Sequence, residues 1–155
     1  MRVAVLSRNS ALYSTSRLVL AAQARGHDVR VLDPLQLSIT VDTKKQPPYF
    51  EGEPLQGIDG VIPRIGASVT RYGATVLNEF ERVGTVTLNS GDSILLARNK
   101  VASLQVLARA RIRVPATVCL RGVSGLEGAI KAVGPFPVIL KLQHGTQGIG
   151  TMMAE

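Results

Sequence analysis

The chain has 155 residues, and its 18 lysines and arginines against 11 aspartates and glutamates give a formal charge of +7 at pH 7. Its hydrophobic fraction of 45% is ordinary for a globular protein and excludes a disordered, highly charged segment. A single cysteine excludes an intramolecular disulfide and a cysteine-based zinc site. No apolar run approaches the roughly 18 residues of a membrane span, and the start resembles no signal peptide, so we expect a cytoplasmic protein.

Short apolar runs alternate with helical stretches in the first part of the chain. This alternation predicts an open parallel α/β sheet with flanking helices, whose ligands bind at the carboxyl ends of the strands. Residues 38–55 interrupt the alternation and predict a small hairpin excursion. The predicted strands cover residues 2–6, 28–32, 60–62 and 86–89, and the predicted helices cover residues 14–26, capped by Ser14 or Ser16, and 67–83.

The pattern changes after Asn89 to one long helical stretch over residues 93–111, either straight or bent, which the Val114-Pro115 pair ends. We therefore place a domain boundary here, with a first domain over residues 1–92 and a second domain over residues 93–155. The second part predicts a strand at residues 116–120 that buries Cys119, a helix at 123–133, a strand at 136–142, a glycine-rich loop and a returning strand at 151–155.

The glycine-rich loop and the lysine before it are the first candidates for chemistry. Glycines let a backbone approach a ligand closely, and their N–H groups can line a concavity for phosphate oxygens. A glycine-rich loop is more often an ordinary turn, however, and this spacing matches neither a Rossmann fingerprint nor a Walker loop. Lys141 ends the apolar strand that enters the loop, where a lysine is costly unless its ammonium reaches an anion or extends to water. Both interpretations of Lys141 stay open at this point.

Several motifs in order along the chain resemble one known family. Residues 136–150, FPVILKLQHGTQGIG, resemble the lysine strand and glycine-rich loop of the ATP-grasp ligases. The remaining motifs resemble the RimK family, which ligates glutamate to the C-terminus of the sixth protein of the small ribosomal subunit, using ATP and magnesium. These motifs are VAVLSR at 3–8, GH at 26–27, VLDP at 31–34, VIPRIG at 61–66, YG at 72–73, LN at 88–89, ARNK at 97–100 and LAR at 107–109.

This resemblance implies a pre-ATP-grasp domain of Rossmann-like type, followed by the first α+β half of an ATP-grasp subdomain. It also implies that Lys141 contacts the nucleotide and that Lys100 reaches a phosphate group. No residue is assigned a catalytic role, His144 of the loop included. The loop residues that would close over the triphosphate are Gly145, Thr146, Gln147, Gly148 and Gly150.

The resemblance also implies three substrate-facing residues at strand ends: Arg8 and Arg64 follow predicted strands, and Asn89 is the last residue of one. We assign Arg8 or Arg64 to a substrate carboxylate, because a guanidinium binds a carboxylate through two parallel hydrogen bonds. A structural tie to neighbouring backbone carbonyls is the open alternative for both arginines.

The sequence departs from the family where the family continues to an adenine-binding lid and to the acidic and asparagine residues that hold magnesium. After residue 92 only Glu127 and Glu155 are acidic, so we expect the magnesium ligands to lie outside this chain. We therefore expect that the chain alone does not complete the ligase reaction. The exposed edge of the strand at residues 151–155 favours a homo-oligomer.

The alternative function is a non-catalytic binding module for a ribosomal protein, an acidic peptide or RNA. Residues 93–126 contain six basic residues and no acidic one, and the two open interpretations are an anionic partner and a solvated helix face. Nucleic acid is the less favoured partner, because an aromatic content of 4% provides no stacking platform for bases.

Overall fold

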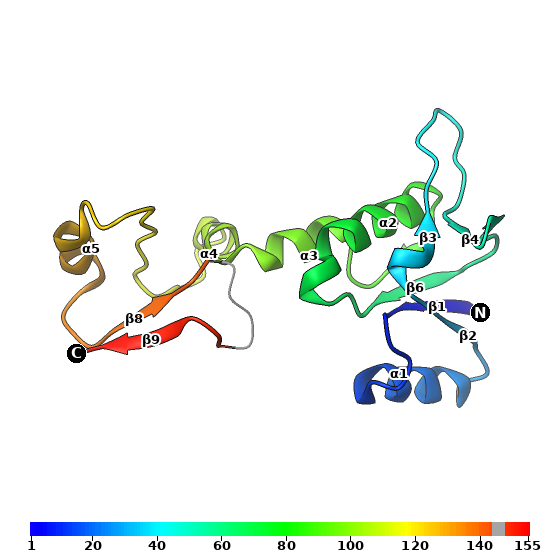
Figure 1. Cartoon of the computed structure of the whole chain (residues 1–155), viewed down its shortest axis with the longest axis horizontal. Coiled ribbons are helices and arrows are strands. Elements are labelled where there is room, and N and C mark those ends of the chain that lie inside the picture. The colour runs from blue at the N-terminus through cyan, green and yellow to red at the C-terminus, as the bar shows by residue number, and fades with distance from the viewer. Residues whose placement is uncertain (144–147) are drawn as a thin grey trace. The chain divides into compact units, whose positions relative to one another are not determined.

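The computed structural model describes residues 1–143 and 148–155. It divides into two compact units, Met1–Leu95 and Leu96–Glu155 (Figure 1). Among the described residues, no helix combines the length and the hydrophobicity that crossing a membrane requires.

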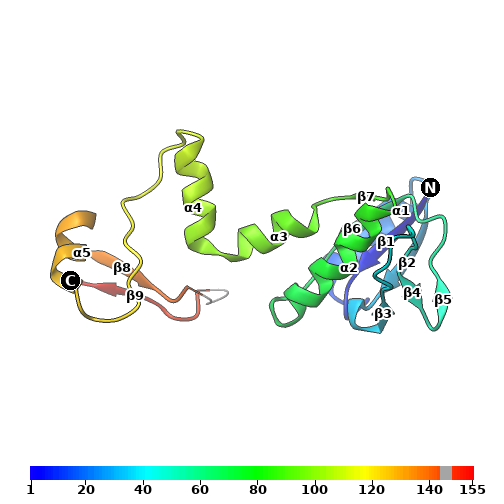
Figure 2. The same cartoon turned by 90° about the horizontal axis from the view of Figure 1, so that it is seen from above.

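A four-stranded parallel sheet in the order β2-β1-β6-β7 organises the first unit. Helix α1 covers one face of this sheet and α2 covers the other (Figures 1 and 2). The residues of β1 from Val3 to Leu6 are buried, as expected for a parallel strand covered on both faces. The predicted open parallel α/β fold is confirmed. The elements are β1 (Arg2–Leu6), α1 (Tyr13–Gln23), β2 (Asp28–Leu32), β6 (Gly60–Pro63), α2 (Thr70–Arg82) and β7 (Val86–Thr87).

Helix α2 supplies much of the core of this unit. Its apolar residues recur at intervals of three and four, which places them on one face of the helix. Val76, Leu77 and Phe80 are all 0% exposed and belong to the same cluster as Ala4 and Leu6 of β1. The 3-10 helix η2 (Ala67–Val69) leads directly into α2. Burial of these side chains stabilises the sheet and fixes the position of its strand ends.

The predicted excursion at residues 38–55 is present as three very short antiparallel strands in the order β3-β4-β5. The hydroxyl of Tyr72 on α2 donates to the carbonyl oxygen of Leu37 at 2.7 Å, which attaches this small sheet to the main body. Arg30 of β2 lies 5.7 Å from the ring centre of Phe50, within the range of a cation–π contact. The elements are η1 (Pro34–Gln36), β3 (Leu37–Ser38), β4 (Tyr49–Phe50) and β5 (Glu53–Pro54).

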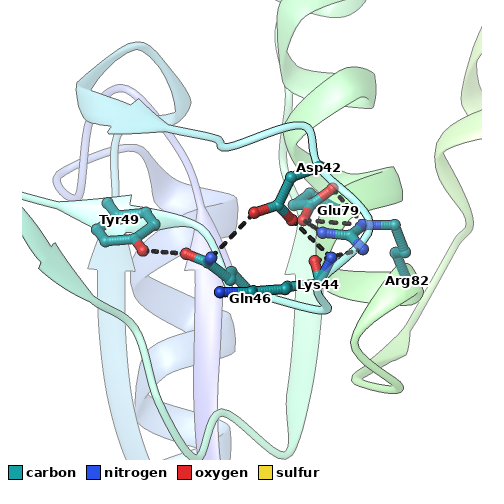
Figure 3. A network of polar contacts seen from close by, with 6 residues as sticks. All are labelled: Asp42, Lys44, Gln46, Tyr49, Glu79 and Arg82. Carbon is teal, nitrogen blue, oxygen red and sulfur yellow. Dashed lines mark hydrogen bonds and ion pairs between the residues drawn. The ribbon is translucent and has the colours of Figure 1, made fainter.

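A polar network ties the loop between β3 and β4 to α2 (Figure 3). The buried carboxylate of Glu79 accepts from Arg82, and Arg82 Nη1 also donates to the carbonyl oxygen of Lys44 at 2.9 Å. The hydrogen bond that Arg82 donates to Glu79 raises the pKa of the Arg82 guanidinium above its ordinary value. Within the loop, the side chains of Asp42, Gln46 and Tyr49 continue the network.

The helical part of the second unit differs from the prediction of one helix over residues 93–111. The structure has two helices, α3 (Gly91–Arg98) and α4 (Lys100–Arg109), separated at Asn99. Asn99 Oδ1 accepts from the backbone N–H of Ala102 at 3.1 Å, so this side chain caps the start of a new helix. The break therefore has a local cause in the sequence, and it makes Lys100 the first residue of α4.

The predicted strand at residues 116–120 is wrong, because this segment runs as irregular chain and pairs with no other strand. Cys119 is exposed rather than buried. The apolar, β-branched composition that favours a strand is not sufficient without a neighbouring edge to pair with. After this segment come α5 (Leu126–Val133) and the antiparallel pair of β8 (Val138–Lys141) and β9 (Thr151–Ala154), in which Lys141 pairs with Thr151.

Buried side chains are distributed unevenly between the two units. The buried hydrophobic core lies wholly in Met1–Leu95, and none of the described residues of Leu96–Glu155 is buried. The β8–β9 hairpin exposes Ile139, Leu140, Met152 and Met153 to between 45% and 60%. The second unit is therefore held by backbone hydrogen bonds and polar contacts more than by apolar burial.

We predict that Phe80→Ala lowers the free energy of unfolding of the first unit by about 3–5 kcal/mol, because the side chain is fully buried. Tyr13→Ala is the matched control, since Tyr13 is 81% exposed and its removal is expected to cost less than about 0.5 kcal/mol. Urea unfolding followed by circular dichroism measures both. Equal costs for the two variants would contradict the assignment of this core.

Candidate functional site

The carboxyl ends of three adjacent strands bring Arg8, Arg64 and Asn89 to one edge of the first unit's sheet. Strand β1 pairs with β6, β6 pairs with β7, and all three run parallel, so their ends meet at the same edge. Arg64 follows β6 directly, and Arg8 and Asn89 come two residues after β1 and β7. All three side chains are exposed. Ligands of open parallel sheets bind at this edge, so we name these three residues the substrate edge.

Serine hydroxyls on neighbouring helices hold the two arginines of the substrate edge. Arg64 Nη2 donates to the hydroxyl of Ser14 on α1 at 3.0 Å. Arg8 Nη1 makes a longer contact of 3.5 Å with the hydroxyl of Ser68 on η2. A guanidinium has five N–H donors, and a neutral hydroxyl leaves its charge uncompensated. Each arginine therefore keeps both charge and donors for a carboxylate.

These serines are functional candidates that sequence reasoning did not identify. Ser14 was expected to cap the first helix, but the N-cap is Leu12, whose side chain makes no capping hydrogen bond. Ser14 instead lies in the first turn of α1 and contacts Arg64 across 50 residues of sequence. A serine near a helix start is a common capping signal, so only the fold separates the two roles.

A buried pair of hydroxyl groups fixes the start of the loop after β1. Ser7 is 2% exposed and Thr15 is 0% exposed, and their hydroxyl oxygens lie 3.0 Å apart. The backbone N–H of Ser7 also donates to the carbonyl oxygen of Leu32 at 2.9 Å. Because buried hydroxyls are costly unless they are paired, this contact fixes where the chain leaves β1 and hence where Arg8 begins.

The second candidate region is the hairpin of β8 and β9 with the start of α4. The ammonium of Lys100 donates to the carbonyl oxygens of Leu142 at 3.1 Å and Gln143 at 3.0 Å, so it lies at the end of β8. Lys141 is the last residue of β8 and its side chain is exposed. The fold therefore brings Lys100 and Lys141, which are 41 positions apart in the sequence, to the same end of one strand.

Two glycines close the returning side of this hairpin. Gly148 and Gly150 have φ angles of 79° and 72°, in the left-handed region that glycine adopts without steric cost. The backbone N–H of Leu142 donates to the carbonyl oxygen of Gly150 at 3.0 Å, and a Cβ at Gly150 would lie 2.4 Å from Leu142 Cδ1. The other predicted nucleotide contacts of the loop, Gly145, Thr146 and Gln147, lie outside the described residues, as does His144.

No metal site is formed by the part of the chain that the structure describes. Histidine, cysteine, aspartate and glutamate residues nowhere gather there in a group of three that could hold a metal ion. The described residues therefore supply no ready-made group of magnesium ligands.

Comparison with known proteins covers the whole chain. Residues 1–94 match the model of the RimK PreATP-grasp domain, and residues 97–155 match the model of the RimK-like ATP-grasp domain. Two relatives are each called probable alpha-L-glutamate ligase. The one from Nitrosococcus oceani is 49% identical to this chain and the one from Halorhodospira halophila is 46% identical, in both cases over 155 residues and 100% of this chain. The match covers 52% and 51% of those two relatives, so the chain spans about half of their length.

Solved structures show the same fold. A RimK domain ATP-grasp protein from Sphaerobacter thermophilus matches with a TM-score of 0.72 and 25% identity, over 100% of this chain and 55% of that one. The D-alanyl-alanine synthetase A of Vibrio cholerae matches with a TM-score of 0.64 over 99% of this chain and 51% of that one, and at 14% identity this likeness concerns the fold alone.

We predict that Gly150→Ala opens the hairpin and that Gly148→Ala opens it less. Both positions have left-handed φ angles, so alanine is strained at either, but only the Cβ at Gly150 meets Leu142, while that at Gly148 meets nothing within 4 Å. Hydrogen exchange of the Leu142 amide measures the opening. Exchange is expected to be at least about tenfold faster in Gly150→Ala than in Gly148→Ala. Equal exchange rates in the two variants would show that only the backbone conformation, and not the close contact with Leu142, requires glycine at position 150.

Proposed function

The chain belongs to the RimK family, and on that premise we propose that it is the N-terminal part of an ATP-dependent carboxylate–amine ligase. In this proposal residues 1–92 form the pre-ATP-grasp domain, and residues 93–155 form the first part of the ATP-grasp subdomain. The amine substrate is glutamate, and the carboxylate substrate is the C-terminus of a ribosomal protein. The names of the relatives support glutamate, and the family resemblance of the sequence supports the ribosomal acceptor.

The observation that carries this proposal is the convergence of Lys100 and Lys141 on one end of the hairpin. Both residues lie in the part of the chain that the ATP-grasp model matches. Lys100 is fixed by two carbonyl oxygens at the end of β8, and Gly148 and Gly150 leave two positions of the returning chain without a side chain. Ammonium groups and backbone N–H groups are the donors that stabilise a transferring phosphoryl group. We propose that this end of the hairpin binds the phosphates of ATP.

The reaction that follows from this site has two steps. An oxygen of the substrate carboxylate attacks the γ-phosphorus of ATP, the bond to the β-phosphate oxygen breaks, and an acyl phosphate and ADP form. The amino nitrogen of glutamate then attacks the acyl carbon, phosphate leaves with the C–O bonding pair, and the nitrogen loses a proton to give the amide. Lysine charges would lower the free-energy cost of the negative charge that develops in the first step.

The substrate edge supports the carboxylate part of the proposal. Arg8 and Arg64 have neutral serine partners, so a substrate carboxylate would supply the counter-charge that the hydroxyls do not. Asn89 has both an amide donor and a carbonyl acceptor for a peptide or amino-acid group. In this proposal the arginines bind a carboxylate and Asn89 contributes a substrate hydrogen bond.

We predict that Lys141→Ala lowers ATP-dependent glutamate incorporation at least about 100-fold, because phosphoryl transfer depends on charge stabilisation. The assay uses a protein with the full length of the relatives and follows labelled glutamate entering the acceptor together with ADP release. Lys131→Ala, at an exposed lysine in the last turn of α5, is the control and is expected to keep full activity. Unchanged incorporation in Lys141→Ala would remove this residue from the site.

Exposed arginines at the end of α4 favour a second candidate function, the binding of an acidic peptide. Arg109, Arg111 and Arg113 are all exposed, and Arg111 has a left-handed φ of 58° at the helix end, where glycine is the usual residue. Arginine is strained in this conformation where glycine is not, which favours a binding role for the Arg111 side chain.

For this second function, binding of a labelled poly-glutamate peptide to the chain is expected to weaken steeply with salt. The double variant R109S/R111S is expected to lose most of this binding. K44S/K45S, which removes two exposed lysines of the first unit, is expected to keep it. Binding that does not depend on salt, measured by fluorescence anisotropy, would rule out the arginines as the contact.

A further inference from the structure

The segment that carries Asn89 is fastened to α2 by one carboxylate. Glu81 Oε1 accepts from the hydroxyl of Thr87 at 2.6 Å and from the backbone N–H of Gly91 at 3.0 Å. One side chain in the last turn of α2 therefore holds the chain on both sides of Asn89, two residues before it and two residues after it. Because the acceptor is a carboxylate, both hydrogen bonds are of the stronger, charge-assisted kind.

Close packing reinforces this attachment at Gly91. A Cβ at Gly91 would lie 1.8 Å from Asn78 Oδ1 and 2.7 Å from the carbonyl oxygen of Ala74, so the backbone at this position is pressed against α2. Asn78 Nδ2 also donates to Asp92 Oδ1 at 3.3 Å. The chain from Thr87 to Asp92, which includes the first two residues of α3, is therefore attached to the surface of α2.

The sheet fixes the same segment from its other side. The backbone N–H of Leu88 donates to the carbonyl oxygen of Val61 at 3.0 Å, which extends the pairing of β7 with β6 up to the residue before Asn89. The Leu88–Asn89 peptide bond is cis. Asn89 is thus an exposed side chain on a backbone that is held before it and after it.

We propose that Glu81 is a positioning residue that sets the place of Asn89 at the substrate edge. The proposal rests on the proposed function, which gives Asn89 its contact with substrate. Glu81 itself touches no substrate: it acts by fixing the backbone of residues 87–91, and loss of its carboxylate lets Asn89 move away from the strand ends. A displacement of about 1 Å at a substrate contact is enough to cost up to about 100-fold in turnover.

The test compares Glu81→Ala, which removes both hydrogen bonds, with two variants that remove fewer of them. The ligase assay uses a protein with the full length of the relatives. Glu81→Ala is expected to raise KM about tenfold for whichever substrate Asn89→Ala impairs. Thr87→Val removes one of the two hydrogen bonds and is expected to raise KM by a smaller factor. Glu81→Gln keeps an oxygen acceptor and is expected to restore a KM close to that of the unchanged protein.

Glu79→Ala controls for general loss of stability in α2. Glu79 lies on the same helix, but its carboxylate holds Arg82 and not the segment after β7. We expect Glu79→Ala to lower the melting temperature without raising KM. A KM that rises equally in Glu79→Ala and Glu81→Ala would show that destabilised α2, and not the position of Asn89, affects the substrate, and would overturn the proposal.

The double variant separates this proposal from the proposed function. If Glu81 acts through Asn89, then adding Glu81→Ala to Asn89→Ala raises KM no further than Asn89→Ala alone. Independent, multiplying effects of the two substitutions would overturn the positioning role while leaving Asn89 as a substrate contact. No effect of Asn89→Ala on either KM would instead remove Asn89 from the proposed site, and the role of Glu81 with it.

Discussion

The burial of β1 between two helices is the constraint on which the first unit depends. Its residues from Val3 to Leu6 are inaccessible because α1 and α2 cover opposite faces of the sheet, and β2 and β6 take up both of its hydrogen-bonding edges. A strand enclosed in this way cannot shift in register without exposing its apolar side chains or losing backbone pairs. The carboxyl ends of β1 and β6 are therefore fixed relative to each other, and so are the backbone positions from which Arg8 and Arg64 extend.

The second unit shows a different balance of forces. Since none of its described residues is buried, the hairpin is held largely by directional contacts: the β8–β9 backbone pairs, the bond from Leu142 to Gly150, and the ammonium of Lys100 on two carbonyl oxygens. Segments with few buried apolar contacts open at low free-energy cost. If the hairpin binds phosphate as proposed, it can adjust to a nucleotide at low free-energy cost, whereas the strand ends of the first unit are already fixed.

Much of this architecture could be predicted from the sequence, because local pattern and global fold agree there. The strands at residues 2–6 and 28–32 have the observed limits. The first is an almost continuous apolar run before a polar segment, and the second ends at the Asp33-Pro34 pair. The strand predicted at 116–120 failed because strand formation needs a partner edge, which no local pattern reports. The break at Asn99 did carry a signal, an asparagine before a helical run, but the apolar pattern continues across it.

The places of the three candidate residues in the fold were predictable for the same reason. Arg8 and Arg64 follow predicted strands and Asn89 ends one, and chain order is enough to locate a strand end; their role in binding stays a prediction. The residues that contact them or their backbone could not be predicted. Ser14, Ser68 and Glu81 lie on helices and make contacts that depend on how those helices pack in the fold, which no local sequence pattern reports. In each case the group that would meet a ligand comes from the sheet, and the group that holds it in place comes from a helix packed against that sheet. Under the proposed function, specificity would therefore depend on how the helices pack as much as on which residues end the strands, and a change in α1 or α2 would alter substrate binding without touching the substrate.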